Sequence, residues 1–314
     1  MNLLNLFRPS RPKAETPEPG ERHAVVALGG GGARGLAHLG VMQSISESGI
    51  HAERIVGVSM GSLVGAMCAG DTDINRVKSR GLELLHSPVF KQKQEILFGA
   101  APASGEENAG GIFSWYSRMR KYVQAHRKLT RGVTSPSLIS DFALSESINY
   151  LIPDIDIQDL AIPLSIVAVD LLSGQRVVLE KGPLQKAVCA SSAIPGIFPP
   201  VPWDNMLLAD IGVIESVPTV VASMYASDLV IGVDVGQDPT KVDACETALQ
   251  VMMRIDDISE QLMRRHLIDA ADLVVRPNVG GVPWYDFTKP EELISEGRRA
   301  GHRALRRFNE RVAA

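Results

Sequence analysis

Residues 55–63 read Ile55-Val56-Gly57-Val58-Ser59-Met60-Gly61-Ser62-Leu63. A short apolar run ends at Gly57, and apolar residues at helical spacing begin just after Ser59. This pattern predicts a buried strand, a sharp turn and a helix, with Ser59 held at the turn. Gly57 and Gly61 allow neighbouring backbone to approach closely, which leaves the serine oxygen accessible at the end of the strand. The stretch therefore indicates a nucleophilic serine on an α/β scaffold.

A glycine-rich turn lies upstream of this serine. The apolar run from His23 to Leu28 predicts a strand, and four consecutive glycines, Gly29–Gly32, follow it directly. Apolar residues at helical spacing then begin at Leu36. A loop with free backbone N–H groups at the start of a helix favours negative charge. The sequence therefore predicts an anion-binding turn close to the predicted serine.

Three interpretations of this turn compete. Gly30, Gly32 and Gly35 fit the G-x-G-x-x-G fingerprint of dinucleotide-binding folds, but the second predicted strand ends in Ser59 rather than in an acidic residue. No Lys-Ser/Thr pair follows the glycines, which excludes a Walker P-loop. The second interpretation is a tight turn without a chemical role. The third is an oxyanion hole, whose amides stabilise the tetrahedral oxygen formed when Ser59 attacks an ester.

Three motifs of the chain, in this order, resemble those of patatin-like phospholipases. The motifs are Gly30–Gly35, Gly57–Gly61 and Ala190–Pro195. The resemblance covers about residues 23–312 and is closest to bacterial cytoplasmic members related to neuropathy target esterase. It implies an α/β fold of three layers, α/β/α, around a mainly parallel sheet. It also implies hydrolysis of lipid acyl esters by a Ser–Asp dyad that uses no histidine.

The resemblance and the residue pattern together assign roles around Ser59, the expected nucleophile. We expect the oxyanion hole to be formed by backbone amides of four residues, Gly30, Gly31, Gly32 and Met60. We expect four further residues to support the site, Arg34, Gly57, Gly61 and Gly212. Nothing in the sequence calls for a metal ion or an organic cofactor.

The base that activates the serine has to be chosen from three acids. Asp170, Asp210 and Asp234 each end a predicted strand, and spacing alone does not separate them. By the resemblance Asp210 is the base, because Asp210-Ile211-Gly212 lies where the family carries Asp-Gly-Gly or Asp-Gly-Ala. Ile211 departs from that pattern. If the backbone there needs a positive φ, a β-branched residue would be strained unless Gly212 takes the unusual angle or the loop follows another path.

A Ser–Asp–His triad is the alternative catalytic unit. The histidines that follow Asp210 are His266 and His302, and both lie in basic helical segments where we expect solvated side chains. His38 follows the glycine turn on the first predicted helix, where a core histidine is the expected role.

Composition limits the remaining functions. The chain has 314 residues, a net charge of −4 and 5% aromatic residues, which argues against a nucleic-acid partner. Its three cysteines have neither metal nor redox spacing, and no apolar run approaches the roughly 18 residues that a membrane span needs. We therefore expect a cytoplasmic protein. Residues 1–20 predict a disordered proline-rich tail, and residues 21–314 predict a single domain.

A helical insertion is predicted at about residues 88–150. Within it, residues 112–131 combine aromatic residues at helical spacing with six basic residues, among them Arg118 and Lys121. Such a helix suits peripheral contact with a membrane, and the alternative is an ordinary surface helix packed on the domain. The insertion lies between Ser59 and Asp210 in the sequence, which also suits a lid over the site. The sequence does not indicate an oligomeric state.

The sequence therefore predicts a serine hydrolase that acts on phospholipid or lysophospholipid esters. The alternative is a non-catalytic regulatory protein that uses the fold to bind a protein partner, and Ile211 is the only residue that favours it. A nucleotide-binding enzyme is a third hypothesis, carried by the glycine turn alone.

Overall fold

The computed structural model describes residues 22–98 and 142–313. The predicted tail at residues 1–20 and the predicted basic helix at 112–131 lie outside the described residues, as does most of the predicted insertion. In the described part of the chain, no helix combines the length and the hydropathy needed to cross a membrane.

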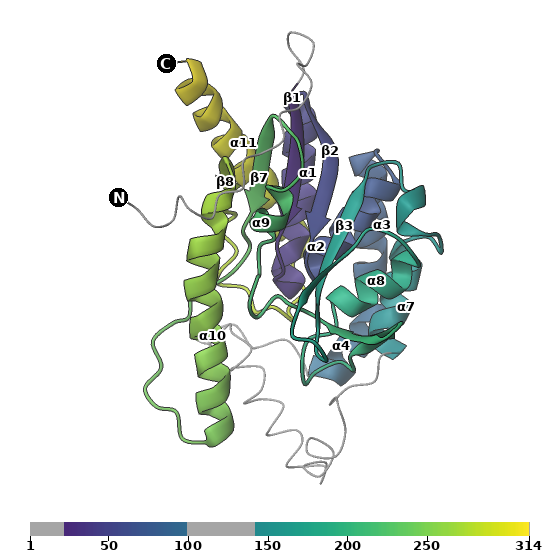
Figure 1. The fold of residues 1–314 in the computed structure, drawn as a ribbon, viewed down its shortest axis with the longest axis vertical. Coiled ribbons are helices and arrows are strands. Elements are labelled where there is room, and N and C mark those ends of the chain that lie inside the picture. Colours follow the sequence, from purple (N-terminus) through teal and green to yellow (C-terminus); the bar gives the residue numbers. More distant parts are fainter. Residues whose placement is uncertain (1–21, 99–141, 314) are drawn as a thin grey trace.

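The core of the protein is one eight-stranded sheet with the order β5-β6-β3-β2-β1-β7-β8, and β4 pairs with β3 beside this path (Figure 1). Its strands are β1 (Arg22–Leu28), β2 (Ile50–Gly57), β3 (Leu164–Asp170), β4 (Arg176–Leu179), β5 (Val201–Trp203), β6 (Met206–Ala209), β7 (Leu229–Val233) and β8 (Leu273–Val275). The pairs between β3, β2, β1, β7 and β8 are parallel, whereas β4, β5 and β6 pair antiparallel. The mainly parallel sheet predicted from the sequence is confirmed, and β4, β5 and β6 form its antiparallel part.

Helices cover both faces of this sheet. They are α1 (Ala37–Glu47), α2 (Met60–Gly70), α3 (Ile74–His86), α4 (Pro88–Phe98), α7 (Phe142–Leu151), α8 (Leu184–Ser191), α9 (Thr219–Ala222), α10 (Ala248–Leu267) and α11 (Pro290–Ala313), with short 3-10 helices at Gly32–Leu36, Ile157–Asp159 and Ile268–Ala270. Helices α2 and α8 pack on one face, and α9 packs on the other face over β1, β2 and β7. The arrangement is the predicted three-layer α/β/α sandwich.

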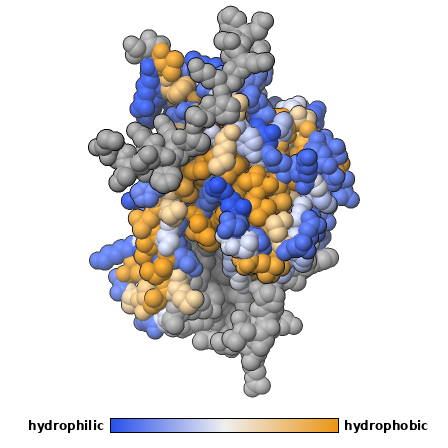
Figure 2. Space-filling model, viewed as in Figure 1, coloured by the Kyte–Doolittle hydropathy of each residue, from blue (hydrophilic) through white to orange (hydrophobic). Residues whose placement is uncertain are grey.

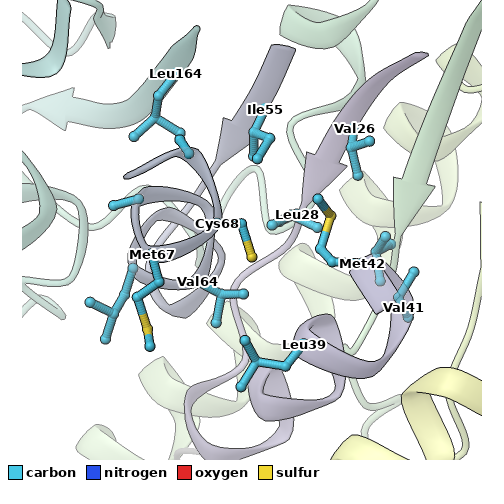
Figure 3. Close-up of a cluster of buried hydrophobic side chains, with 14 of the residues drawn as sticks. Val26, Leu28, Leu39, Val41, Met42, Ile55, Val64, Met67, Cys68 and Leu164 are labelled. Atoms are coloured by element: carbon cyan, nitrogen blue, oxygen red, sulfur yellow. The ribbon is translucent and has the colours of Figure 1, made fainter. Parts of the chain in front are cut away.

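The larger core lies between the sheet and helices α1 and α2. Figure 3 shows Leu39 and Val41 from α1, and Val64 and Met67 from α2, gathered on the side chains of β1 and β2. Residues Ala24–Leu28 of β1 are fully buried, as expected for a parallel strand covered on both faces. A smaller core on the other face includes Val58 and Ile211. Both cores meet at the carboxyl ends of β1 and β2, where the two predicted turns lie.

The pairing register explains how Ser59 and Asp210 come together. In the parallel pair of β2 with β3, Gly57 lies opposite Ile166, so two more residues bring Ser59 level with Ala168. In the antiparallel pair of β3 with β6, Ala209 lies opposite Val169, so the next residue, Asp210, also comes level with Ala168. The two residues therefore flank β3 at the same height, one on each side.

Candidate active site

Ser59 occupies the N-terminal cap of α2, at the turn that the sequence predicts. Its φ of 54° and ψ of −124° lie in a region that residues with a side chain rarely adopt. The Ser59 N–H donates to Ser191 Oγ (2.9 Å), and that hydroxyl donates to the Val167 carbonyl of β3 (2.7 Å). The Ser62 N–H donates to the Ser59 carbonyl (2.9 Å). These bonds hold the turn in place from both sides.

The glycines on either side of Ser59 are required by close backbone packing. A Cβ at Gly61 would lie 2.1 Å from the Leu28 carbonyl oxygen, and a Cβ at Gly57 would lie 2.5 Å from Ser62 Cα. No larger residue fits either position without moving the strand or the helix. Gly57 and Gly61 therefore allow the close packing of strand and helix that brings Ser59 to the surface of a cavity.

The glycine turn after β1 lies against Ser59. A Cβ at Gly30 would be 3.3 Å from Ser59 Cβ. The Gly30 N–H, however, donates to the Ser216 carbonyl (2.7 Å), so this amide is already engaged and the expected oxyanion role of Gly30 loses support. Within the described residues, the N–H groups of Gly31, Gly32 and Met60 have no backbone acceptor.

Asp210 lies beside Ser59 and is nearly inaccessible to solvent. Burial raises the pKa of its carboxyl group to about 6, although a hydrogen bond with the Ser59 side chain and another from the Gly212 N–H oppose that rise. The Gly212 N–H donates to Asp210 Oδ1 at 2.7 Å, and the Asp210 N–H donates to the Ala193 carbonyl at 3.0 Å. A carboxylate with a pKa near neutrality is suited to accept a proton from a hydroxyl group.

The backbone at Ile211 is unstrained. Among the described residues, only Ser59 and Asp204 combine a side chain with a positive φ, and Gly212 is not among the glycines that have one. The loop therefore takes a path that needs no unusual angle after Asp210. The Ile211 side chain is buried in the smaller core with Val58 and Val167.

The other two strand-end acids have structural partners. Asp170 accepts hydrogen bonds from Ser173, Leu172 and Leu207, and the bond from the Ser173 side chain is the main reason that its pKa falls to about 2. Asp234 pairs with Arg264 (3.0 Å) and Arg276 (3.1 Å). Neither acid lines a cavity with Ser59, so the geometry singles out Asp210.

None of the three histidines considered from the sequence contacts Ser59. His38 is fully buried with Nε2 2.7 Å from the Gly29 carbonyl oxygen, and burial lowers its pKa to about 4. It therefore supports the glycine turn as a neutral donor. His302 lies 2.9 Å from Glu47 on the surface, and His266 is exposed on α10. In residues 22–98 and 142–313, no group of His, Cys, Asp and Glu side chains is arranged to hold a metal ion.

Arg34 is a buried cation next to the glycine turn. Its Nε donates to the Gly31 carbonyl (3.3 Å) and its Nη1 donates to Gln237 Oε1 (2.8 Å). Burial lowers the pKa of this guanidinium to about 10, which leaves it charged at neutral pH. The contact with Gly31 is the one expected of a residue that fixes the turn.

Ser59 lines two cavities of different character. One, of about 160 Å³, is walled almost entirely by apolar side chains of α2, α3 and α7, including Met67, Leu85 and Ile148. The other, of about 150 Å³, also contains Asp210 and the glycine turn, and its far wall carries Arg34 and acidic residues of α10. An acyl carbon bonded to Ser59 could thus extend an apolar chain into one cavity and a polar group into the other.

Sequence reasoning missed two residues that organise this site. Ser191 holds the Ser59 amide through its hydroxyl group, and Ser216 holds the Gly30 amide through its carbonyl. Ser191 lies within the third quoted motif, so its position was visible but its bond was not. The Ser216 contact is made by its backbone carbonyl, so the identity of the residue gave no indication of it.

Comparison with known proteins relates the chain to a protein family. Residues 26–223 match a family model described as patatin-like phospholipase. Patatin-like phospholipase domain-containing protein 6 of Mus musculus is 31% identical over 218 residues, which cover 68% of this chain and 14% of that protein. An uncharacterized NTE family protein of Mycobacterium bovis is 31% identical over 209 residues, covering 66% of this chain and 48% of that one.

A solved structure was also found. VipD from Legionella pneumophila matches with a TM-score of 0.45 and 15% sequence identity, over 98% of this chain and 73% of that chain. The chain spans less than half the length of the two relatives named above.

Proposed function

Because the chain belongs to the patatin-like phospholipase family, we propose that it is a serine hydrolase that cleaves acyl esters of phospholipids or lysophospholipids. The observation that carries the proposal is the hydrogen bond between the Ser59 side chain and a buried carboxyl group, Asp210, whose pKa is raised to about 6. A hydroxyl group needs a neighbouring base before it becomes a good nucleophile, and Asp210 is the base in contact with it.

The reaction begins when ionised Asp210 takes the proton of Ser59 Oγ while that oxygen bonds to the acyl carbon. The amides of Gly31, Gly32 and Met60 are free to donate to the resulting oxyanion, and each such donor is worth about 3–4 kcal/mol in other hydrolases. Asp210 then gives the proton to the oxygen of the departing alcohol, as the bond between this alcohol oxygen and the acyl carbon breaks.

Release of the fatty acid repeats these steps with water. Asp210 removes a proton from a water molecule, whose oxygen attacks the acyl-serine carbon, and Ser59 leaves with the proton restored. The same carboxyl group acts as base and acid in both halves. In this scheme Arg34 and His38 act on the glycine turn and not on the substrate.

The two cavities support a lipid substrate. The apolar cavity beside Ser59 suits a hydrocarbon chain, because burial of apolar surface is favourable by roughly 25 cal/mol per Å². The polar cavity suits the glycerol and headgroup of the leaving alcohol. The three cysteines of the chain are free thiols, which supports a cytoplasmic site of action.

The proposal is tested by covalent labelling and by ester hydrolysis. Wild-type protein should react at Ser59 with an alkyl fluorophosphonate and should hydrolyse a short-chain p-nitrophenyl ester. Ser59→Ala and Asp210→Asn should each lose hydrolysis, while His266→Ala and His302→Ala, which are matched imidazole deletions on the surface, should retain it. Folded wild-type protein that neither labels nor hydrolyses would favour the non-catalytic regulator.

The regulator hypothesis has lost its sequence support. It rested on Ile211, and the backbone there has no positive φ that a β-branched residue would resist. No other described feature favours it over hydrolysis.

A further inference from the structure

Helix α10 has two sides with different roles. Its inner side is anchored to the domain, because Arg264 pairs with Asp234 (3.0 Å) and the Ser216 hydroxyl donates to Glu260 (2.5 Å). Arg254 and Asp257 on this side, together with Glu260, line the polar cavity that contains Ser59. One side of the helix is therefore a wall of the candidate active site.

The outer side of α10 is apolar and exposed. Its large side chains have exposed fractions of 46% for Val251, 65% for Met252, 56% for Ile255, 52% for Leu262 and 40% for Met263. At 100° per residue these five positions fall within one third of the helix circumference, turned away from Arg254, Asp257 and Glu260, while Asp256 at the edge of the stripe also lines the cavity. Figure 2 shows hydrophobic side chains gathered in this region, at the lower left, where Figure 1 places α10.

This apolar stripe is not an ordinary scatter of surface residues. Thirteen large hydrophobic side chains are exposed in the described residues, and five of them lie on this one helix face. Ser259 and His266 are the polar residues within the stripe, and Asp256 lies at its edge. Large apolar side chains gathered on one helix face in this way are typical of a site of contact with another molecule.

We propose that the outer face of α10 (Val251, Met252, Ile255, Leu262 and Met263) docks onto the surface of a lipid layer. The proposal rests on the proposed function, since a lipid ester is presented in a layer and the opposite side of the same helix lines the cavity at Ser59. Docking would hold α10, and with it one wall of that cavity, at the layer that holds the substrate.

The size and charge of the stripe favour a lipid layer over a second copy of the chain. Five side chains exposed to this degree present roughly 500 Å², whereas a stable dimer buries about 800 Å² on each partner. A helix lying in a lipid interface needs only one apolar face without buried charge, and no carboxylate lies inside the stripe. Because the contact is apolar, it should persist on zwitterionic vesicles at high salt, where binding by a basic segment such as 112–131 would be screened.

The experiment compares two triple variants of the full chain. Met252→Gln/Ile255→Gln/Leu262→Gln removes the centre of the stripe, and Val89→Gln/Met224→Gln/Val312→Gln removes three exposed apolar side chains elsewhere. Glutamine is a good helix former, so the stripe variant should fold, and its thermal unfolding checks this. Binding is measured by co-sedimentation with phosphatidylcholine vesicles in 0.5 M salt, at about the ionic strength where surface charges are well screened.

The stripe variant should bind these vesicles about tenfold more weakly or worse, while the control variant should bind like wild type. Unchanged binding by the stripe variant, or an equal loss in both variants, would overturn the proposal. The proposal would also be overturned if the wild-type protein did not bind vesicles but sedimented as a dimer, and the stripe variant sedimented as a monomer.

Two readouts separate this proposal from the proposed function. Hydrolysis of a soluble short-chain ester should be the same in the stripe variant and wild type, since none of the three substituted residues lines a cavity with Ser59. Ser59→Ala protein should bind vesicles like wild type although it cannot hydrolyse esters. Vesicle binding by a protein without esterase activity would leave docking supported and the hydrolase proposal refuted.

Discussion

At Ser59 the backbone is held in a conformation that costs a residue with a side chain about 1–3 kcal/mol. The hydrogen bond that the Ser59 N–H donates to Ser191 and the one that Ser59 accepts from Ser62 maintain this conformation, and the helix that follows fixes its direction. In this conformation the Ser59 side chain lies at the two cavities that it lines.

A pair of substitutions measures this strain. Ser59→Ala and Ser59→Gly both remove the nucleophile, but only glycine adopts a φ of 54° freely. Glycine also loses about 0.4–1 kcal/mol through the entropy of the unfolded chain. We expect Ser59→Gly to exceed Ser59→Ala by about 1 kcal/mol in the free energy of unfolding measured with urea. A Ser59→Gly variant that is less stable than Ser59→Ala by about 0.4–1 kcal/mol would show that the turn is unstrained, because only the entropy loss of glycine would then remain.

The buried carboxyl group of Asp210 should lower the free energy of unfolding at neutral pH, where it is ionised. Its pKa rises from 3.8 to about 6 on folding, so the folded state disfavours the ionised carboxylate. The penalty is absent below about pH 4, grows up to pH 6 and stays constant above it. Asp210→Asn should therefore be about 3 kcal/mol more stable than wild type at pH 8, with no advantage at pH 4.

Asp170→Asn is the matched control for that measurement. The pKa of Asp170 is lowered to about 2 by its hydrogen bonds, so its ionised form stabilises the fold above pH 3.8. This stability is lost as the pH falls through about 2. Replacing Asp170 should therefore destabilise the protein at pH 8, which is the opposite sign to Asp210→Asn.

The same pKa sets the pH dependence of catalysis. Only ionised Asp210 can accept the Ser59 proton, so kcat/KM should rise about tenfold per pH unit up to pH 6 and then level off. Hydrolysis of a soluble ester from pH 4.5 to 8.5 would show this. If kcat/KM of the wild type rose with a midpoint near pH 7, and this midpoint changed in His38→Gln, the base would be a histidine instead.

For individual residues, much of the candidate site could be predicted from the sequence. Ser59 was predicted from the two glycines around it, because each replaces a Cβ that would collide with backbone. Asp210 needed the family resemblance, since Asp170 and Asp234 end strands in the same way. The engaged amide of Gly30 could not be predicted, because its acceptor is the backbone of Ser216, a residue far away in the sequence.

Helices α1 and α11 pack unusually closely, and glycines make this contact. A Cβ at Gly297 of α11 would lie 1.9 Å from the Ala37 carbonyl oxygen, and a Cβ at Gly40 of α1 would lie equally close to Ile294. Ala37 directly follows the short 3-10 helix Gly32–Leu36, which ends the glycine turn. The C-terminal helix therefore supports the turn that faces Ser59.

Gly297→Ala tests this support. The added methyl group should push α11 from α1, lower the free energy of unfolding by about 1–3 kcal/mol and reduce kcat by displacing the glycine turn. Gly281→Ala is the control, because a Cβ there meets nothing within 4 Å and should change neither quantity. A loss of stability without any loss of kcat would show that the turn does not depend on α11.

At the level of elements the sequence predicted strands and helices better than their pairing. The apolar runs of β1 and β2 were predicted near their observed positions. The direction of β6 was not, because a four-residue strand such as Met206–Ala209 carries no periodic signal for parallel or antiparallel pairing. Close packing of α1 on α11 was also missed, since glycines inside helices have several explanations.

Across the whole molecule, the two cavities that Ser59 lines lie where the sheet, the α2–α3–α7 group and α10 meet. The apolar cavity reaches Gly81 of α3, where an added Cβ would find Met67 and Leu39 at ordinary contact distances of 3.7 and 3.8 Å. A small residue at that place leaves room for a chain. Under the proposed function, the depth of this cavity should limit the length of acyl group that is hydrolysed.

Gly81→Leu should shorten the preferred acyl chain. A leucine side chain would occupy part of a cavity of about 160 Å³, so kcat/KM for long-chain esters should fall about tenfold or more while short-chain esters are spared. A series of p-nitrophenyl esters of increasing length measures the change. Gly81→Ala, which adds a single methyl group without a clash, should have a smaller effect in the same direction. An equal loss for all lengths would mean that chains bind elsewhere.

The antiparallel pairing of β6 with β3 has a consequence for how the protein matures. A shift of one residue in that pairing would carry Asp210 about 3.4 Å along β3 and turn its side chain to the opposite face. Ser59 and its turn could then be native while the molecule stayed inert. Recovery of esterase activity during refolding therefore reports correct pairing of β6 with β3, and we expect it to lag behind the return of helical signal.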